Sequence, residues 1–215
     1  SGSIVEHTYA AEGTYTISLR VTDDDSAHDT VVASVLALSP TVSIQAVAKG
    51  ANWRWSYLPG EPPNGWNQLG FDASAWTSGA APLGFGSAQV VSNIDTYPDT
   101  ASRPKTAYFS RTFEISDLAR VQQVTVTTVA DDGVAIYVNG IEVGRANLPT
   151  GTLTSNTSAS SARNATTAAA SPVTFSLPLS ILTAGTNTVA AETHLNYRGT
   201  ADSTFWSTIS ITSLR

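Results

Sequence analysis

The chain has 215 residues and a formal net charge of −6, contains no cysteine, and has only 13% charged residues. The missing cysteines exclude disulfides, thiolate metal sites and cysteine nucleophiles. The acidic balance disfavours nucleic acid and anionic membrane as partners, and no segment reaches the ~20 apolar residues of a membrane span. Abundant Thr, Ser, Ala and Val between turn residues are typical of an all-β secreted domain. No signal peptide is recognisable, so we expect a preceding segment to direct export.

The first predicted element is a hairpin with an acidic tip. Residues 14–22 alternate apolar and polar side chains, residues 30–37 form a second β-rich run, and Asp23-Asp24-Asp25-Ser26 forms the turn between them. The segments HTYA, EGTYTI and LRVTDDD in this region resemble the end of a PKD domain, the immunoglobulin-like spacer of secreted hydrolases and adhesins. The resemblance covers only the last strands of that fold. It implies an immunoglobulin-like fragment over residues 1–39.

The remaining chain, residues 40–215, reads as one larger unit of short strands. Many short strands with turn residues between them indicate a β-sandwich or jelly roll. Helical periodicity is scarce, with one turn expected at 72–76 and another at 178–182. Residues 150–171 have low complexity and no apolar periodicity, which predicts a long exposed loop, either mobile or draped on the surface. The predicted strands are 41–48, 52–57, 106–115, 121–130, 134–138, 141–145, 173–177, 187–195 and 204–212.

Four segments of this unit resemble a known kind of module. FDASAWTSGAAPLGFG, TAYFSRTFEI, VADDGVAIYVNGIEVGRANLPTG and GTNTVAAETHL occur in this order. Together they resemble a galactose-binding-like jelly roll, similar to the sugar-binding domain of family 2 glycoside hydrolases and to modules attached to secreted phosphoesterases and polysaccharide lyases. The resemblance implies the fold specifically. It implies the ligand only weakly, since such modules have carbohydrate-binding, calcium-binding and purely structural roles.

The Asn139-Gly140 pair lies between two β-rich runs and predicts a hairpin with a two-residue turn. Such a turn sets the register, so that Val138 faces Ile141. Side chains alternate between the two faces of a strand, which assigns one set of apolar residues to the core face. That set comprises Val134, Ile136, Ile141 and Val143.

Continued past the apolar layer, the same register gathers polar residues at the rim of the sandwich. It places Val134 opposite Arg145 and Asp132 opposite Asn147. Three interpretations remain open: an Asp132–Arg145 ion pair that closes the end of the core, contacts to sugar hydroxyls from Asp132, Arg145 and Asn147, or a calcium site. Anthrax protective-antigen-type lectins, which resemble this module, ligate calcium with an Asp-Asp pair. That resemblance implies the pair Asp131 and Asp132 as ligands. Asp202 is a further candidate ligand, and backbone carbonyls would have to complete the six to eight oxygens that calcium takes.

Two further groups of residues are candidates for ligand contact. His194 ends a strand and Asn196 lies in the loop that follows, so both are candidates to reach the same rim, although a lone histidine is more often structural. Trp66 follows a turn-rich segment and is the aromatic candidate for stacking on a sugar ring. Trp53, Trp55 and Tyr57 share one strand face, which predicts core packing, and Trp76 is likewise expected to fill the core.

No catalytic motif stands out, because Gly-x-Ser-x-Gly, His-Glu-x-x-His and a phosphate loop are all absent. We therefore expect a non-catalytic, carbohydrate-binding accessory module of a larger secreted bacterial protein. Its expected partners are a polysaccharide or oligosaccharide and an upstream catalytic domain in the same polypeptide, with neither nucleic acid nor membrane. The alternative is a structural or calcium-stabilised spacer or adhesion domain without a sugar ligand.

Overall fold

The computed structural model describes residue 4 and residues 6–38 and 40–215. The described residues divide into two units, one reaching to Val42 together with Leu214 and Arg215, the other spanning Ser43–Ser213. Strands are the main regular secondary structure of both units. No helix in the described residues is long and apolar enough to cross a membrane.

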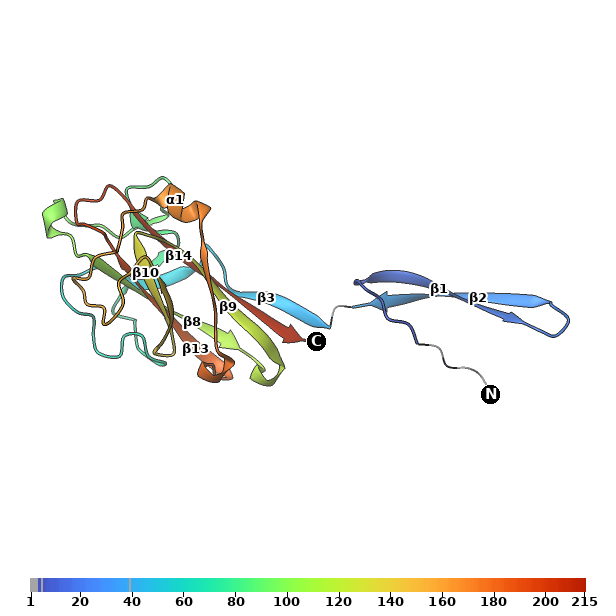
Figure 1. Ribbon diagram of the computed structural model, residues 1–215. Coiled ribbons are helices and arrows are strands. Elements are labelled where there is room, and N and C mark those ends of the chain that lie inside the picture. Colours follow the sequence, from blue (N-terminus) through green and yellow to red (C-terminus); the bar gives the residue numbers. More distant parts are fainter. Residues whose placement is uncertain (1–3, 5, 39) are drawn as a thin grey trace. The chain divides into compact units, whose positions relative to one another are not determined.

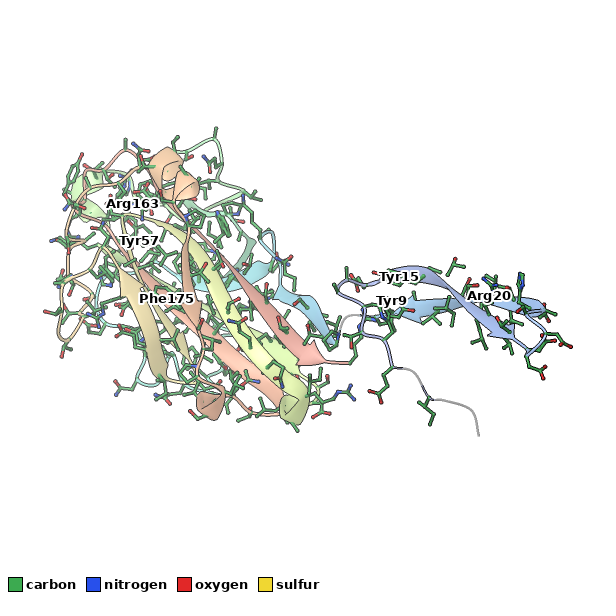
Figure 2. All side chains as sticks on the ribbon, turned by 45° about the vertical axis from the view of Figure 1, so that its right-hand side comes forward. Tyr9, Tyr15, Arg20, Tyr57, Arg163 and Phe175 are labelled. Atoms are coloured by element: carbon green, nitrogen blue, oxygen red, sulfur yellow. The ribbon has the colours of Figure 1, made fainter. Side chains whose placement is uncertain are left out.

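The first unit is the predicted hairpin. β1 (Gly13–Thr22) pairs antiparallel with β2 (His28–Ala37), with Tyr15 opposite Val35. The carboxylate of Asp23 accepts the backbone N–H groups of Asp25 and Ala27, which stabilises the acidic turn. Tyr9 stacks on Tyr15 with ring centroids 4.2 Å apart (Figure 2). The hairpin is thus confirmed, whereas its membership of a PKD domain stays a prediction.

The second unit is a β-sandwich, as the sequence predicts. One sheet has the strand order β11-β10-β13-β8-β4-β5 and the other β12-β9-β14-β6-β7, while β3 pairs with β14 (Figure 1). The strands are β3 (Thr41–Val47), β4 (Asn52–Ser56), β5 (Thr77–Ala80), β6 (Leu83–Phe85), β7 (Ser92–Asn93), β8 (Thr106–Ile115), β9 (Val121–Asp131), β10 (Gly133–Val138), β11 (Ile141–Ala146), β12 (Val173–Ser176), β13 (Gly185–His194) and β14 (Ser203–Leu214). The helices are α1 (Ala165–Ala170) and the 3-10 turns η1 (Thr100–Ser102), η2 (Leu118–Arg120) and η3 (Leu179–Ile181).

The hydrophobic core lies between the two sheets. Phe109 of β8 stacks on Phe205 of β14 with centroids 4.2 Å apart, and Trp53 meets the same Phe205 edge-on. The predicted core positions Trp53 and Tyr57 are 1% and 3% exposed, while Trp55 is partly buried against the core. Burial of such large aromatic rings supplies much of the driving force for the sandwich.

The six-stranded sheet is covered on its second face as well. On β13, Val189 and Ala191 belong to the core, so the period of two turns Glu192 and His194 to the opposite face, yet these two side chains are also buried. Two loops lie over them. Trp66 of the first packs on Tyr108 and Tyr137, and the loop after β11 hydrogen-bonds to His194.

The segment 150–171 is largely exposed and lies along the sheet, the second of the two predicted alternatives, but it is more ordered than its composition predicts. It contains α1, and Ser155, Ala159, Ala165 and Ala168 are buried. Its many Ala, Ser and Thr side chains are small, so its backbone can approach the sheet closely and exchange hydrogen bonds with it, such as Ala159 N–H to the carbonyl of Leu195. Of the two predicted helical turns, 178–182 contains η3, whereas 72–76 forms a hydrogen-bonded turn rather than a helix.

The β10–β11 register follows the prediction only next to the turn. Val138 faces Ile141 and Tyr137 faces Glu142, but a bulge then shifts the pairing, so Arg145 faces Ala135 rather than Val134. The bulge lies beside Gly144, where an added Cβ would come within 2.3 Å of the ring of Phe175.

The bulge changes which side chains share a face. Val134 and Ile136 are in the core as predicted, and Val143 is only partly buried against it. Ile141, predicted to be in the core, is 53% exposed because it lies at the tip of the hairpin, on the turn side of the bulge where the pairing is as predicted. An inserted residue reverses the alternation beyond it, which counting from the turn could not foresee.

Candidate functional site

The predicted rim residues Asp132, Asn147 and Asn196 do come together, in a closed hydrogen-bond network. Asp132 is buried, and its carboxylate accepts the backbone N–H of Arg163 at 2.5 Å and that of Asn196 at 2.7 Å. The side-chain amide of Asn147 donates to the carbonyls of Asp132 and Ser161. The side chain of Asn196 donates to the carbonyl of Ala159. These residues bind the loop after β11 to the sheet, which favours the structural interpretation over sugar contact.

Asp131 differs from its neighbour because neither of its carboxyl oxygens has a hydrogen-bond partner, although the residue is 0% exposed. Burial, helped by the nearby carboxylates of Asp132 and Asp202, raises the pKa of Asp131 to about 8. Asp202 itself accepts the backbone N–H of Ala165 at 3.1 Å.

The fit to the predicted calcium site is poor. Within the described ranges, no three acidic or histidine side chains are grouped so that they could hold a metal ion. Asp131, Asp132 and Asp202 therefore do not form such a site by themselves, and two of the three carboxylates already accept backbone N–H groups. Calcium binding stays a prediction that backbone carbonyls would have to complete.

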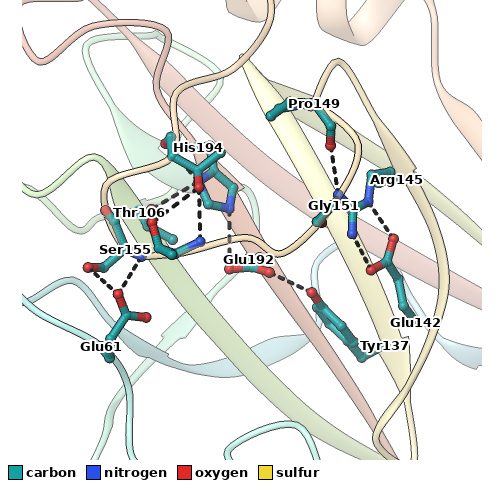
Figure 3. A network of polar contacts seen from close by, with 12 residues as sticks. Glu61, Thr106, Tyr137, Glu142, Arg145, Pro149, Gly151, Ser155, Glu192 and His194 are labelled. Carbon is teal, nitrogen blue, oxygen red and sulfur yellow. Dashed lines mark hydrogen bonds and ion pairs between the residues drawn. The ribbon is translucent and has the colours of Figure 1, made fainter.

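Arg145 does not join the Asp132 network, contrary to the predicted register. Its guanidinium pairs with Glu142 at 2.6 Å and donates to the carbonyls of Pro149 and Gly151 (Figure 3). The bulge places Arg145 beside Glu142 on the outer face of β11, so the Asp132–Arg145 ion pair considered from sequence is wrong. The guanidinium instead donates hydrogen bonds to the first residues of the loop after β11.

His194 lies in a separate buried chain of polar contacts (Figure 3). Its Nδ1 is 3.0 Å from the carbonyl of Thr157 and must carry a proton, because a carbonyl can only accept. Its Nε2 is 3.2 Å from Glu192, which is within ion-pair distance but outside hydrogen-bond geometry, and Glu192 also accepts the hydroxyl of Tyr137 at 2.5 Å. With 0% and 5% exposure, His194 and Glu192 are not placed to touch a ligand.

Trp66 is half-buried and packs edge-on against Tyr108 and Tyr137 of the six-stranded sheet. It also stacks on Trp76, with centroids 6.4 Å apart. Trp76 therefore belongs to this outer aromatic layer, together with Phe71, and not to the sandwich core as predicted. The sequence around a tryptophan does not indicate whether its ring packs in the core between the sheets or against the outer face of the six-stranded sheet.

Sequence reasoning missed the open part of this outer face. Two adjoining hollows of about 240 and 250 Å³ share the lining residues Arg54, Ser110, Arg111 and Thr112. We call them together the β4–β8 groove. The first hollow adds Asn52, Trp53 and Ser78, and the second adds Phe71, Asp72, Ala73 and Ser74.

The groove combines the group types that sugar recognition needs. Arg54 and the hydroxyl side chains offer donors, Asp72 offers an exposed carboxylate, and Phe71 offers a half-buried ring. Asp72 is kept ionised because the backbone and hydroxyl of Ser74 donate to it, which lowers its pKa. These residues come from four separate segments of the chain, so no local sequence motif predicts them.

No family model matches this chain, and no curated protein matches it. Solved structures of β-glucuronidases do resemble it. A Bacteroides uniformis β-glucuronidase and the β-glucuronidase 2 of that organism bound to cyclophellitol-6-carboxylate aziridine each match 80% of this chain at 18% identity, with a TM-score of 0.52. A β-glucuronidase from glycoside hydrolase family 2 matches 74% at 16% identity, with a TM-score of 0.48.

This likeness is one of fold. The chain spans only 18% of the length of the two Bacteroides uniformis structures, so it corresponds to one part of those enzymes. The sandwich is thus a domain fold that also forms part of larger carbohydrate-active proteins. Identity at this level carries no information about which residues bind a ligand.

Proposed function

We propose that this protein is a non-catalytic carbohydrate-binding module of a larger secreted protein, and that saccharide binds in the β4–β8 groove. As an accessory module it would keep an upstream catalytic domain of the same polypeptide close to its polysaccharide. The observation that carries the proposal is the groove itself. It combines a guanidinium and hydroxyls of the six-stranded sheet with an aromatic ring and a carboxylate of the loop between β4 and β5.

Two features support binding without catalysis. Retaining and inverting glycosidases place two carboxyl groups about 5–9.5 Å apart across an accessible cleft. Here Asp131, Asp132 and Glu192 are buried beneath the loop after β11, and Glu142 is engaged by Arg145. Asp72 is the one acidic side chain that lines the described groove, which leaves no second carboxylate there to complete such a pair.

The proposal is tested by a glycan-array screen followed by calorimetry on the full 215-residue chain. We expect saccharide binding that is lost in Arg54→Ala and kept in Asn147→Ala, because Arg54 lines the groove and Asn147 bonds only to internal groups. A folded protein that binds no saccharide at millimolar concentration would overturn the proposal and favour a spacer.

A calcium-stabilised spacer is the second candidate, since Asp131 is buried beside two carboxylates without a partner. If a cation neutralises this cluster, EDTA should lower the melting temperature of the wild type and leave that of Asp131→Ala unchanged, because only a ligand of the folded state shifts unfolding. Equal melting curves with and without EDTA would exclude a calcium requirement.

A further inference from the structure

The register of the six-stranded sheet decides which side chains of the β4–β8 groove share a face. Arg54 of β4 lies opposite Ser78 of β5 on one side and opposite Ser110 of β8 on the other. Trp53, the preceding residue of β4, is 1% exposed in the core, so the period of two turns Arg54 to the outer face. Ser78, Arg54 and Ser110 therefore form one row of polar side chains across three neighbouring strands.

The second arginine of the lining lies on the other side of the sheet. On β8, Arg111 shares the core side with Phe109 and Phe113, and it donates to the backbone carbonyl of Asn52. Arg54 is therefore the one cation among the described lining residues that faces outward.

The loop between β4 and β5 brings a carboxylate to the same hollow. The guanidinium of Arg54 donates to the carbonyl of Trp76 in this loop at 3.1 Å. Asp72 of the loop lines the second hollow together with Arg54, and both side chains are exposed. The hydrogen bonds from Ser74 are the main cause of the lowered pKa of Asp72, and the charge of Arg54 adds to the effect.

The two opposite charges attract each other without closing into contact. In the part of the chain that the structure describes, no ion pair joins Arg54 to Asp72. A guanidinium only donates hydrogen bonds, a carboxylate only accepts them, and a sugar hydroxyl does both. One hydroxyl of a sugar ring can therefore donate to Asp72 while its neighbour accepts from Arg54. Because the two charges offset each other, the pair offers no net charge that would favour an anionic ligand.

We propose that the β4–β8 groove recognises a neutral saccharide by two adjacent hydroxyl groups, one donating to Asp72 and the other accepting from Arg54. This inference rests on the proposed carbohydrate-binding function and specifies its substrate class. Phe71 lines the same hollow, is half-buried, and packs edge-on against Trp76 with centroids 5.5 Å apart. Its ring is available to the apolar C–H face of the same sugar.

Calorimetry with paired oligosaccharides tests the substrate class. Each pair is an acidic oligomer and the same oligomer with its carboxylates reduced to alcohols, prepared from oligogalacturonate, oligomannuronate and oligoglucuronate. The tightest-binding glycan of the array is the further probe. We expect this glycan to be neutral and each reduced oligomer that binds to do so at least as tightly as its acidic partner. The affinity should stay constant between about 0.05 and 0.5 M NaCl, because salt screens the attraction between net charges.

A double-mutant cycle tests whether the two side chains hold one pair of hydroxyls. Arg54→Gln and Asp72→Asn should each weaken binding of the tightest neutral probe about ten-fold, as each removes a hydrogen bond to a charged group. The double variant should weaken it by clearly less than about a hundred-fold, since residues that share a partner are not additive. Asn keeps an acceptor oxygen for the backbone N–H of Ser74, so the turn should stay folded, which melting temperatures check. Arg20→Gln and Asp24→Asn remove the same charges from the exposed β1–β2 hairpin and should leave the affinity unchanged.

The outcomes separate this inference from the proposed function. An acidic oligomer that binds about ten-fold more tightly than its reduced partner, or an array whose tightest ligand is acidic, would overturn the neutral class and leave carbohydrate binding standing. Unchanged affinity in both folded variants, or single effects that multiply fully in the double variant, would overturn the shared pair of hydroxyls. If neither these oligomers nor any glycan of the array binds the folded protein, the proposed function itself fails.

Discussion

Two polar regions of the same sandwich differ in how their side chains are satisfied. Beneath the loop after β11, Asp132, Asn147 and His194 all bond to internal groups, although both carboxyl oxygens of Asp131 and Nε2 of His194 have no hydrogen-bond partner. In the β4–β8 groove, the exposed Arg54 makes one described hydrogen bond, to the carbonyl of Trp76, and the exposed Asp72 accepts from Ser74, so both keep further hydrogen-bonding capacity. Internal pairing indicates a role in folding, and unpaired donors on an open surface indicate a role in binding.

Of these groups without a hydrogen-bond partner, Asp131 gives the largest expected effect. The folded-state pKa of Asp131 is raised to about 8, whereas an aspartate of the unfolded chain ionises at about 4. The folded state thus keeps a proton that the unfolded state releases, so stability is greatest at low pH and is lost as pH rises toward about 8. The slope is up to about 1.4 kcal/mol per pH unit.

Urea denaturation of the wild type and Asp131→Asn between pH 5 and 8, in the presence of EDTA, measures this effect. Asn cannot ionise, so the variant should lose most of the slope and be the more stable protein at pH 8. Parallel slopes for the two proteins would show that Asp131 titrates normally and that its burial costs nothing at neutral pH.

His194→Ala should destabilise the protein by about 3 kcal/mol, because it opens a cavity and leaves Thr157 and Glu192 without their partner. Thermal and urea unfolding measure the loss, with His28→Ala in the exposed hairpin as the matched control. A loss below about 0.5 kcal/mol would place His194 outside the structural network and return it to the ligand candidates.

Asn147→Ala should cost about 1–2 kcal/mol of stability, since it removes the bonds of the side-chain amide to Asp132 and Ser161. Saccharide affinity at a temperature where the variant is folded should equal that of the wild type. Weaker binding by a fully folded Asn147→Ala would move the sugar site from the groove to the rim.

Arg54→Ala has the smallest expected effect on folding, within about 0.5 kcal/mol, because the side chain is exposed and makes a single described hydrogen bond. The expected pattern is opposite to that of Asn147→Ala: saccharide affinity should fall in Arg54→Ala, whereas its stability should stay that of the wild type. Comparing the two variants by calorimetry and denaturation therefore tests the division between the closed network and the open groove directly.

The sequence alone determined the all-β class, the two hairpins and the main strands, because turn residues and a side-chain period of two act over a few residues. It also determined that Asp132, Asn147 and Asn196 meet, since the Asn139-Gly140 turn brings the first two together. Only the tertiary structure decided the rest. A bulge beside Phe175 carried Arg145 to another face, and close packing ordered the loop over residues 150–171. The β4–β8 groove unites residues 52–54, 71–74 and 110–112, whose proximity depends on long-range strand pairing that no local pattern encodes.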